Sequence, residues 1–235
     1  MEPNPELSSR LSEALSLLER GRVDAAADAL ESLVSDGLHS VDVYRTLGEL
    51  RARRERHADA ARWYRATLDS DPRNTESIRN YLDQKLQAEE PQGLGPLVDE
   101  LCRLAEFDVR SWITRARWRL AKGDDSGASE ALDRGEGLDP KSAVLHFHRG
   151  VLWTRLRRLD AAIASFERAI QLDPEYALAW VHLGASLSVR NNHLAGLSHV
   201  RKALRLNPGS LRIRLRAAMC FVQSGHLDLA ETCIE

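Results

Sequence analysis

The sequence predicts an all-α solenoid of antiparallel helix hairpins, and three observations lead to this fold class. Pro140, Pro174 and Pro208 are spaced by 34 residues, and two further steps of the same length back along the chain reach Pro72. Each interval contains two segments with apolar residues at helical spacing, separated by a break such as Gly123-Asp124. No segment alternates apolar and polar residues over a useful length, so strands are not expected.

The period divides the chain into repeated units. Six whole units are expected at residues 7–40, 41–74, 75–108, 109–142, 143–176 and 177–210, with an N-terminal tail at 1–6 and an incomplete seventh unit at 211–235. The second helix of a unit is expected to end at the proline, which has no N–H and disfavours helix in the preceding residue. No single unit can bury its own apolar face, so neighbouring units must stack.

The period and the residues at fixed repeat positions resemble the tetratricopeptide repeat family. That family has the pattern Trp-x2-Leu-Gly-x2-Tyr, followed by Ala, Phe, Ala and Pro at repeat positions 20, 24, 27 and 32. The second, fifth and sixth units supply these residues: Tyr44, Leu47, Gly48, Ala60, Tyr64 and Pro72; Gly150, Trp153, Ala162, Phe166, Ala169 and Pro174; Trp180, Leu183, Gly184, Ala203 and Pro208. The resemblance implies a right-handed superhelix in which small residues at positions 8 and 20 let two helices approach closely.

The third unit, residues 75–108, is degenerate. Tyr81-Leu82 stand where Leu-Gly is expected, and Leu94 replaces the small residue at position 20. Bulky residues at close-approach positions predict a local change of curvature near residues 88–97, although a harmless drift of the repeat is the alternative. Pro96 is tolerable only in the first turn of the second helix.

Composition excludes several classes of function. The 235-residue chain has 43% hydrophobic residues, 29% charged residues and a net charge of −2, which is typical of a soluble globular protein. Nucleic-acid binders usually carry a basic excess, so nucleic acid is not an expected partner. There is no signal peptide and no apolar run of the roughly 18 residues that a membrane span needs. We therefore expect a cytoplasmic location and no membrane insertion.

The sequence contains no motif for catalysis or for a cofactor. Phosphate-binding glycine loops, G-x-S-x-G, H-E-x-x-H and C-x-x-C are all missing. His146 and His148 lie two residues apart and point to different helix faces, whereas His148 and His182 share repeat position 6 and could stack in adjacent units. The arginine-rich run at 51–65 contains interleaved acids, which is typical of a solvated helix end. We expect no metal, no cofactor and no enzymatic activity.

The resemblance implies that the first helices line a concave surface, through positions 2, 5, 9, 12 and 13. In the second to fourth units these positions are mainly polar. The polar candidates for the groove are Arg45, Glu49, Arg79, Asp83, Arg110 and Arg117.

From the fifth unit onward the same positions become apolar. The candidates are Val144, Phe147, Val151, Leu178, Val181, Ala185, Val189, Leu215, Met219 and Val222. A helix that is apolar on its inner face as well as its packing face should not be left in water. We expect this groove to bind an apolar or amphipathic protein segment; the alternative is that a segment of the same chain covers it.

The sequence therefore predicts a non-catalytic scaffold that binds a protein or peptide in its concave groove. Two alternatives remain open. The chain could be the N-terminal recruiting module of a larger glycosyltransferase, sulfotransferase or kinase. It could also self-assemble, because the seventh unit stops within its second helix and leaves the C-terminal end uncapped.

Overall fold

The computed structural model describes residues 5–234, which form 14 α-helices and contain no strand. The chain divides into two compact units, with the boundary between Glu106 and Phe107. The first unit contains α1 Pro5–Glu19, α2 Val23–Ser35, α3 Val41–Arg53, α4 His57–Ser70, α5 Thr75–Gln87 and α6 Gly95–Leu104. The second contains α7 Val109–Ala121, α8 Asp125–Leu138, α9 Ala143–Arg155, α10 Leu159–Leu172, α11 Ala177–Val189, α12 His193–Leu206, α13 Leu211–Gln223 and α14 Leu227–Ile234.

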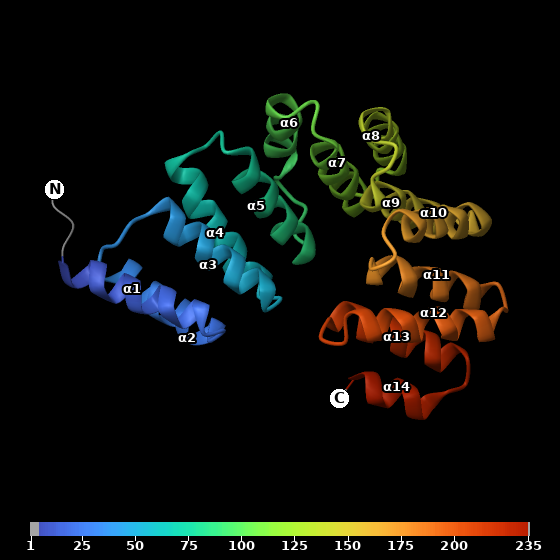
Figure 1. Ribbon diagram of the computed structural model, residues 1–235. Helices are drawn as coiled ribbons and strands as arrows, with labels where there is room; N and C mark the ends of the chain where they lie inside the picture. Colours follow the sequence, from blue (N-terminus) through green and yellow to red (C-terminus); the bar gives the residue numbers. More distant parts are fainter. Residues whose placement is uncertain (1–4, 235) are drawn as a thin grey trace. The chain divides into compact units, whose positions relative to one another are not determined.

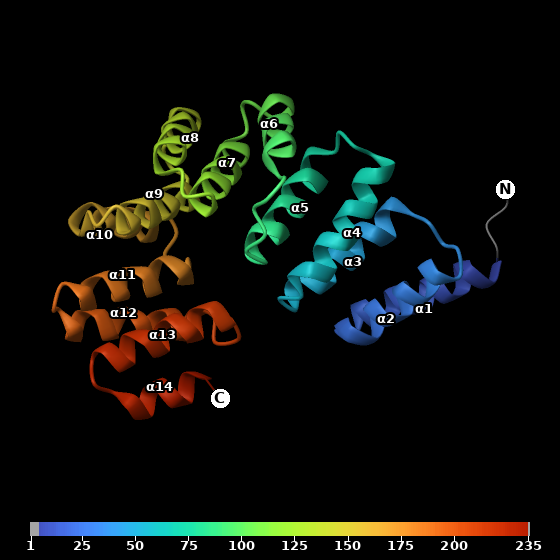
Figure 2. The ribbon, with the colours of Figure 1, turned by 180° about the vertical axis from the view of Figure 1, so that it is seen from behind.

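Within each unit the helices pair as antiparallel hairpins that follow one another along the chain (Figure 1). The view from behind shows the same pairing, with α11 packed on α12 and α13 next to α11 (Figure 2). The first helices α3, α5, α7, α9, α11 and α13 each begin at the first residue of a 34-residue unit of the sequence. The prediction of an all-α repeat solenoid is confirmed.

Each hairpin turns through a residue with left-handed backbone at repeat position 15. These residues are Gly21, Glu55, Glu89, Gly123, Arg157, Asn191 and Gly225. At Arg157, whose φ is 60°, the backbone N–H donates to the Thr154 carbonyl, and the N–H of Arg158 donates to the Trp153 carbonyl 2.9 Å away. This is the Schellman pattern, which ends a helix by satisfying its last carbonyl groups. The turn geometry thus repeats with the sequence even where glycine is absent.

Small residues at positions 8 and 20 bring the two helices of a hairpin together. A Cβ atom added to Gly184 on α11 would lie 2.7 Å from the carbonyl oxygen of Gly196 on α12. A Cβ atom added to Gly150 would lie 2.5 Å from the ring of Phe166, the large residue at position 24. Both distances are shorter than real Cβ contacts, so a side chain at Gly184 would collide with backbone, and one at Gly150 would require the Phe166 ring to move.

Successive hairpins share one apolar interior. In the second unit the ring of Phe147 on α9 lies 5.8 Å from that of Phe166 on α10, measured between ring centroids. It also contacts Tyr176 and His182 of the next hairpin, at 5.1 and 5.0 Å. Because each first helix packs on the hairpin that follows it, burial requires stacked neighbours, as expected for a solenoid.

The third hairpin differs from the others. Its second helix, α6, has only 10 residues, and Pro96 lies in its first turn as the sequence required. The bulky residues Leu94 and Leu101 at the close-approach positions are both buried. The boundary between the compact units follows this hairpin directly. The expected change of curvature near residues 88–97 stays a prediction.

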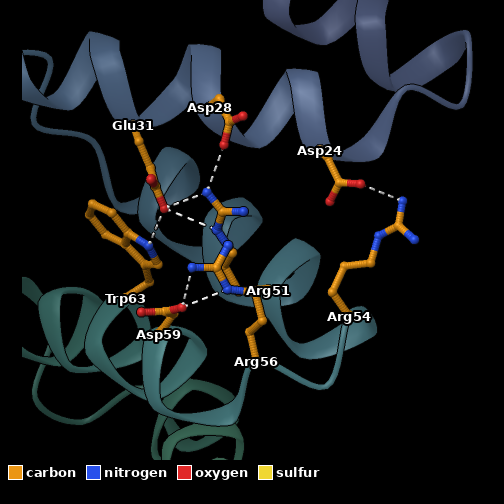
Figure 3. Close-up of polar contacts among 8 residues, drawn as sticks. All are labelled: Asp24, Asp28, Glu31, Arg51, Arg54, Arg56, Asp59 and Trp63. Carbon is orange, nitrogen blue, oxygen red and sulfur yellow. Dashed lines mark hydrogen bonds and ion pairs between the residues drawn. The ribbon is translucent and has the colours of Figure 1, made fainter.

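A polar network joins the first two hairpins (Figure 3). Arg51 on α3 donates to Asp28 and Glu31 on α2, each at 3.0 Å, and Trp63 on α4 donates its indole N–H to Glu31 at 3.2 Å. Arg51 is buried, so the arginine-rich run is not simply a solvated helix end. Hydrogen bonds to the two carboxylates outweigh the burial that opposes its charge and raise its pKa. None of the helices within residues 5–234 is both long and apolar enough to cross a bilayer.

Candidate protein-binding face

The first helices α9, α11 and α13 of the second unit present one common surface, which we call the first-helix face. Its residues recur at helical spacing, at repeat positions 2, 6, 9 and 13. They are Val144, His148, Val151 and Arg155 on α9; Leu178, His182, Ala185 and Val189 on α11; and Arg212, Arg216, Met219 and Gln223 on α13.

The C-terminal part of this face is apolar and open. The exposed fractions of Val189 and Met219 are 63% and 61%, and that of Val222, at the neighbouring position 12 of α13, is 53%. A pocket of about 640 Å³ lies there, between the end of α9 and the C-terminal halves of α11 and α13. Large apolar side chains clustered around a hollow are typical of a site that another molecule covers. Within residues 107–234, no segment of the chain covers them.

Two of the expected groove residues lie elsewhere. Phe147 is only 3% exposed and Val181 is fully buried, so neither lines an open surface. Both occupy repeat position 5, and this position points into the interior because the following hairpin packs on it. Leu215, at position 5 of the last hairpin, is exposed because no described hairpin follows it. The prediction that Phe147 and Val181 line the groove was therefore wrong. The nearest residues of the first-helix face lie at position 6, one residue further along each helix.

The remaining apolar candidates are distributed over the face as follows. Val144 is exposed on α9, and Val151, Leu178 and Ala185 are half-buried. Ala185 and Val189 line the pocket together with Met219. The structure thus brings the residues near the C-terminal ends of α11 and α13 together.

The polar candidates are divided between the two compact units. Arg45 is exposed and pairs with Asp42 on its own helix, 2.7 Å away. Arg79, again at position 5, is buried, so its placement in an open groove was wrong. In the second unit Arg110 pairs with Asp108 at 3.0 Å.

Glu49 and Asp83 lie near the hydroxyl group of Tyr64. Burial raises the pKa of Tyr64 to about 12, and the negative charges of Glu49, Glu76 and Asp83 add to this shift. The positive charge of Arg53 opposes this shift.

Two neutral histidines occupy position 6 on α9 and α11. Burial lowers the pKa of His148 well below 6.5, and the charges of Arg117, Arg212 and His182 act in the same direction. Burial also lowers the pKa of His182, whose neighbours are Arg216 and Arg212. No cluster of three His, Cys, Asp or Glu side chains suitable for a metal ion occurs within the described part of the chain.

Sequence reasoning missed the polar residues of the pocket. Arg155, Arg157, His182 and Arg216 all line it. A register based on position 6 instead of position 5 would have found His182 and Arg216, since both share that position with His148. Arg157 is the left-handed residue of the turn between α9 and α10, and the spacing of apolar residues does not predict its position in the pocket.

Comparison with known proteins gives the class of protein. Residues 11–75 and 143–176 match the tetratricopeptide repeat family. These two segments are tetratricopeptide repeats, and together with the helix hairpins they confirm the resemblance seen in the sequence.

Its relatives of known function are longer proteins. The peroxisomal targeting signal receptors of Candida albicans and Saccharomyces cerevisiae are 24% and 23% identical over 231 and 218 residues. These alignments cover 90% and 89% of this chain but only 37% and 36% of the receptors. A stretch of 87 residues is 31% identical to protein O-mannosyl-transferase TMTC1 of Mus musculus and covers 35% of this chain and 9% of that protein.

Two solved structures share the fold. A tetratricopeptide repeat protein from Parabacteroides merdae aligns with a TM-score of 0.78 at 14% identity, over 96% of this chain and 84% of its own. A chain of the APC/C hetero-tetramer Cut9–Hcn1 aligns with a TM-score of 0.70 at 17% identity, over 94% of this chain and 44% of its own. At identities of 14% and 17%, these two likenesses show a shared fold.

Proposed function

We propose that the first-helix face of the second unit binds an apolar or amphipathic segment of a partner protein, and that the chain acts as a non-catalytic cytoplasmic scaffold. The observation that carries the proposal is the group of exposed apolar side chains on α11 and α13: Val189 and Met219 line the pocket, and Val222 is exposed on the same helix as Met219. Leaving these side chains in water is unfavourable by roughly 25 cal/mol per Å² of apolar surface, so a partner that covers them gains this free energy.

The face suits a peptide better than a reactive small molecule. Its neutral histidines are packed against rings, and the pKa of Cys220 is raised to about 11 by burial, so its thiol stays protonated at neutral pH. Peptide segments that dock in repeat grooves use apolar anchors at regular spacing, which matches the spacing of the exposed residues here.

The test introduces charge into the face without disturbing the core. In the double variant Val189→Glu and Met219→Glu, both substituted side chains are exposed, so we expect native circular dichroism. Capture of partners from a lysate of the source organism, measured by quantitative mass spectrometry, should fall about tenfold for the specific partners, which corresponds to about 1.4 kcal/mol.

The matched control is Leu194→Glu, since Leu194 on α12 is 85% exposed and lies outside the face. This variant should retain the partners. If the double variant and the control capture the same proteins in the same amounts, the first-helix face is not the binding site. Substitution of Phe147 or Val181 does not test the proposal, because charge at these buried positions would unfold the hairpins.

A second proposal is that the chain serves as the recruiting module of a longer enzyme. The similarity of 87 residues to a protein O-mannosyl-transferase favours it, as does the small share of its relatives that the chain spans. Sequencing the transcript beyond the codon for Glu235 tests this: a continuing reading frame with a catalytic domain supports it, and a stop codon excludes it.

A further inference from the structure

The pocket on the first-helix face is cationic as well as apolar. Its lining includes the arginines Arg155, Arg157 and Arg216 and contains no acidic residue. Val189 and Met219 lie beside these arginines in the same lining. An apolar wall next to uncompensated positive charge is complementary to a segment that carries both apolar and acidic side chains.

Two of the three arginines have no partner for their charge. The guanidinium groups of Arg157 and Arg216 form no hydrogen bond or ion pair with any residue in 5–234, whereas Arg155 pairs with Asp125. Arg216 is half-buried on α13. Burial lowers its pKa, opposed only by Cys220, yet an arginine keeps its proton at any physiological pH. A half-buried charge without a partner is unfavourable, and a carboxylate would relieve it.

The surroundings of Arg216 favour one kind of ligand. A planar guanidinium binds a carboxylate through two parallel hydrogen bonds, and partial exclusion of water strengthens them. Single-stranded nucleic acid would need aromatic side chains on which bases stack, and the pocket lining contains no Phe, Tyr or Trp. The aliphatic side chains of Val189 and Met219 suit leucine-like or phenylalanine-like groups instead.

We propose that this pocket binds the side-chain carboxylate of an Asp or Glu that is flanked by apolar residues in a partner segment, with Arg216 as the group that binds the carboxylate. The apolar neighbours of that residue pack on Val189 and Met219, and Arg157 at the pocket rim adds a second positive charge. This inference rests on the proposed function and specifies the chemistry of the partner.

The test is selection from a library of random 12-residue peptides displayed inside a constrained loop, so that no free C-terminal carboxylate is present. Three proteins are used as bait: the unchanged chain, Arg216→Met and Arg201→Met. Methionine keeps the length of the side chain without its charge, and Arg201 is an exposed arginine on α12 outside the pocket. Circular dichroism checks that each bait is folded.

We expect peptides selected on the unchanged chain and on Arg201→Met to share an acidic residue next to apolar ones. This acidic preference should disappear on Arg216→Met. For a selected peptide made synthetically with blocked ends, Glu→Gln should weaken binding to the unchanged chain about tenfold or more. This last measurement needs no protein variant, so it holds even if Arg216→Met does not fold.

Three results overturn the inference. In the first, the selected peptides lose binding to Met219→Glu but are not enriched in acidic residues. This result would leave the proposed function intact and exclude carboxylate recognition. An acidic preference that persists on Arg216→Met would show that general positive charge, not this pocket, attracts the peptides. If no peptide depends on Val189 and Met219, the proposed function fails together with the inference.

Discussion

At the scale of single residues, the histidines at position 6 connect the packing of the hairpins to pH. The ring of His182 lies 5.0 Å from that of Phe147 and 5.3 Å from that of Phe166, and it faces Arg212 and Arg216. His148 faces Arg117, Arg212 and His182. Burial among rings and positive charges disfavours protonation, so both imidazoles are neutral in the folded protein at pH 7.

These pKa shifts predict that acidification destabilises the second unit. In the unfolded chain a histidine has a pKa near 6.5, and in the folded protein both values lie well below it. Below pH 6.5 the unfolded state therefore binds more protons. The free energy of unfolding is unaffected above this pH and should fall by about 1.4 kcal/mol per pH unit for each histidine, until the folded pKa is reached.

Urea denaturation at pH 7.5, 6.5 and 5.5 measures this dependence. His182→Leu should reduce the loss between pH 6.5 and 5.5 by up to about 1.4 kcal/mol, because one histidine with a lowered pKa is removed while His148 and His199 remain. The same substitution at His226, which is exposed on the loop before α14, serves as the control and should retain the full loss. An equal pH dependence in all three proteins would contradict the assignment.

At the scale of elements, hydrogen bonds and ion pairs between side chains link a hairpin to the hairpin before it. Arg51 and Trp63 both donate to Glu31 on α2, and Arg54 pairs with Asp24 at 2.8 Å. The same kind of link recurs in the second unit, where Arg190 pairs with Asp160 at 3.1 Å. Of these contacts, those of the buried Arg51 should add most to stability, because exposed ion pairs such as Arg190–Asp160 contribute little.

Glu31→Ala should destabilise the first unit by about 2 kcal/mol, because it removes the acceptor of two donors, one of them the buried Arg51. The control is Asp69→Ala, which removes an exposed pair with Arg65 and should cost well under 1 kcal/mol. Equilibrium unfolding in urea followed by circular dichroism measures both. A loss for Glu31→Ala no larger than that for Asp69→Ala would show that the network adds no stability.

The sequence predicts closely where each helix begins and ends, but it does not predict which side of the helix is buried. The proline spacing and the small residues at positions 8 and 20 place the helices, since these signals act through the local backbone and through one neighbouring helix. Whether Phe147 or His148 faces outward depends on where the next hairpin packs. A rotation of one residue, about 100° around a helix, separates a core position from an exposed one, and apolar spacing alone does not resolve it.

At the scale of the whole molecule, the chain divides into two compact units. The boundary lies after the short helix α6 of the degenerate third hairpin. Phe107, the first residue of the second unit, is 82% exposed between α6 and α7. An exposed aromatic residue in a short connection between compact units is a favourable site for proteolysis.

Limited digestion of the native protein with chymotrypsin should therefore cleave first after Phe107, because the other large aromatic side chains lie in helices or are better buried. Mass spectrometry should detect two fragments that end and begin at this site. Phe107→Ser should slow the first cleavage. Initial cleavage within a helix of either unit would show that the boundary is not the most accessible part of the chain.

Local chemistry along the chain was enough to predict the repeat, its helix starts and an apolar surface near its C-terminal end, because period, glycine and proline act within one hairpin. Only the tertiary structure decided which side chains form that surface, and that Arg216 lies in it without an ion-pair or hydrogen-bond partner among residues 5–234. These properties arise from packing between hairpins, which brings together side chains from α9, α11 and α13 that are distant in the sequence.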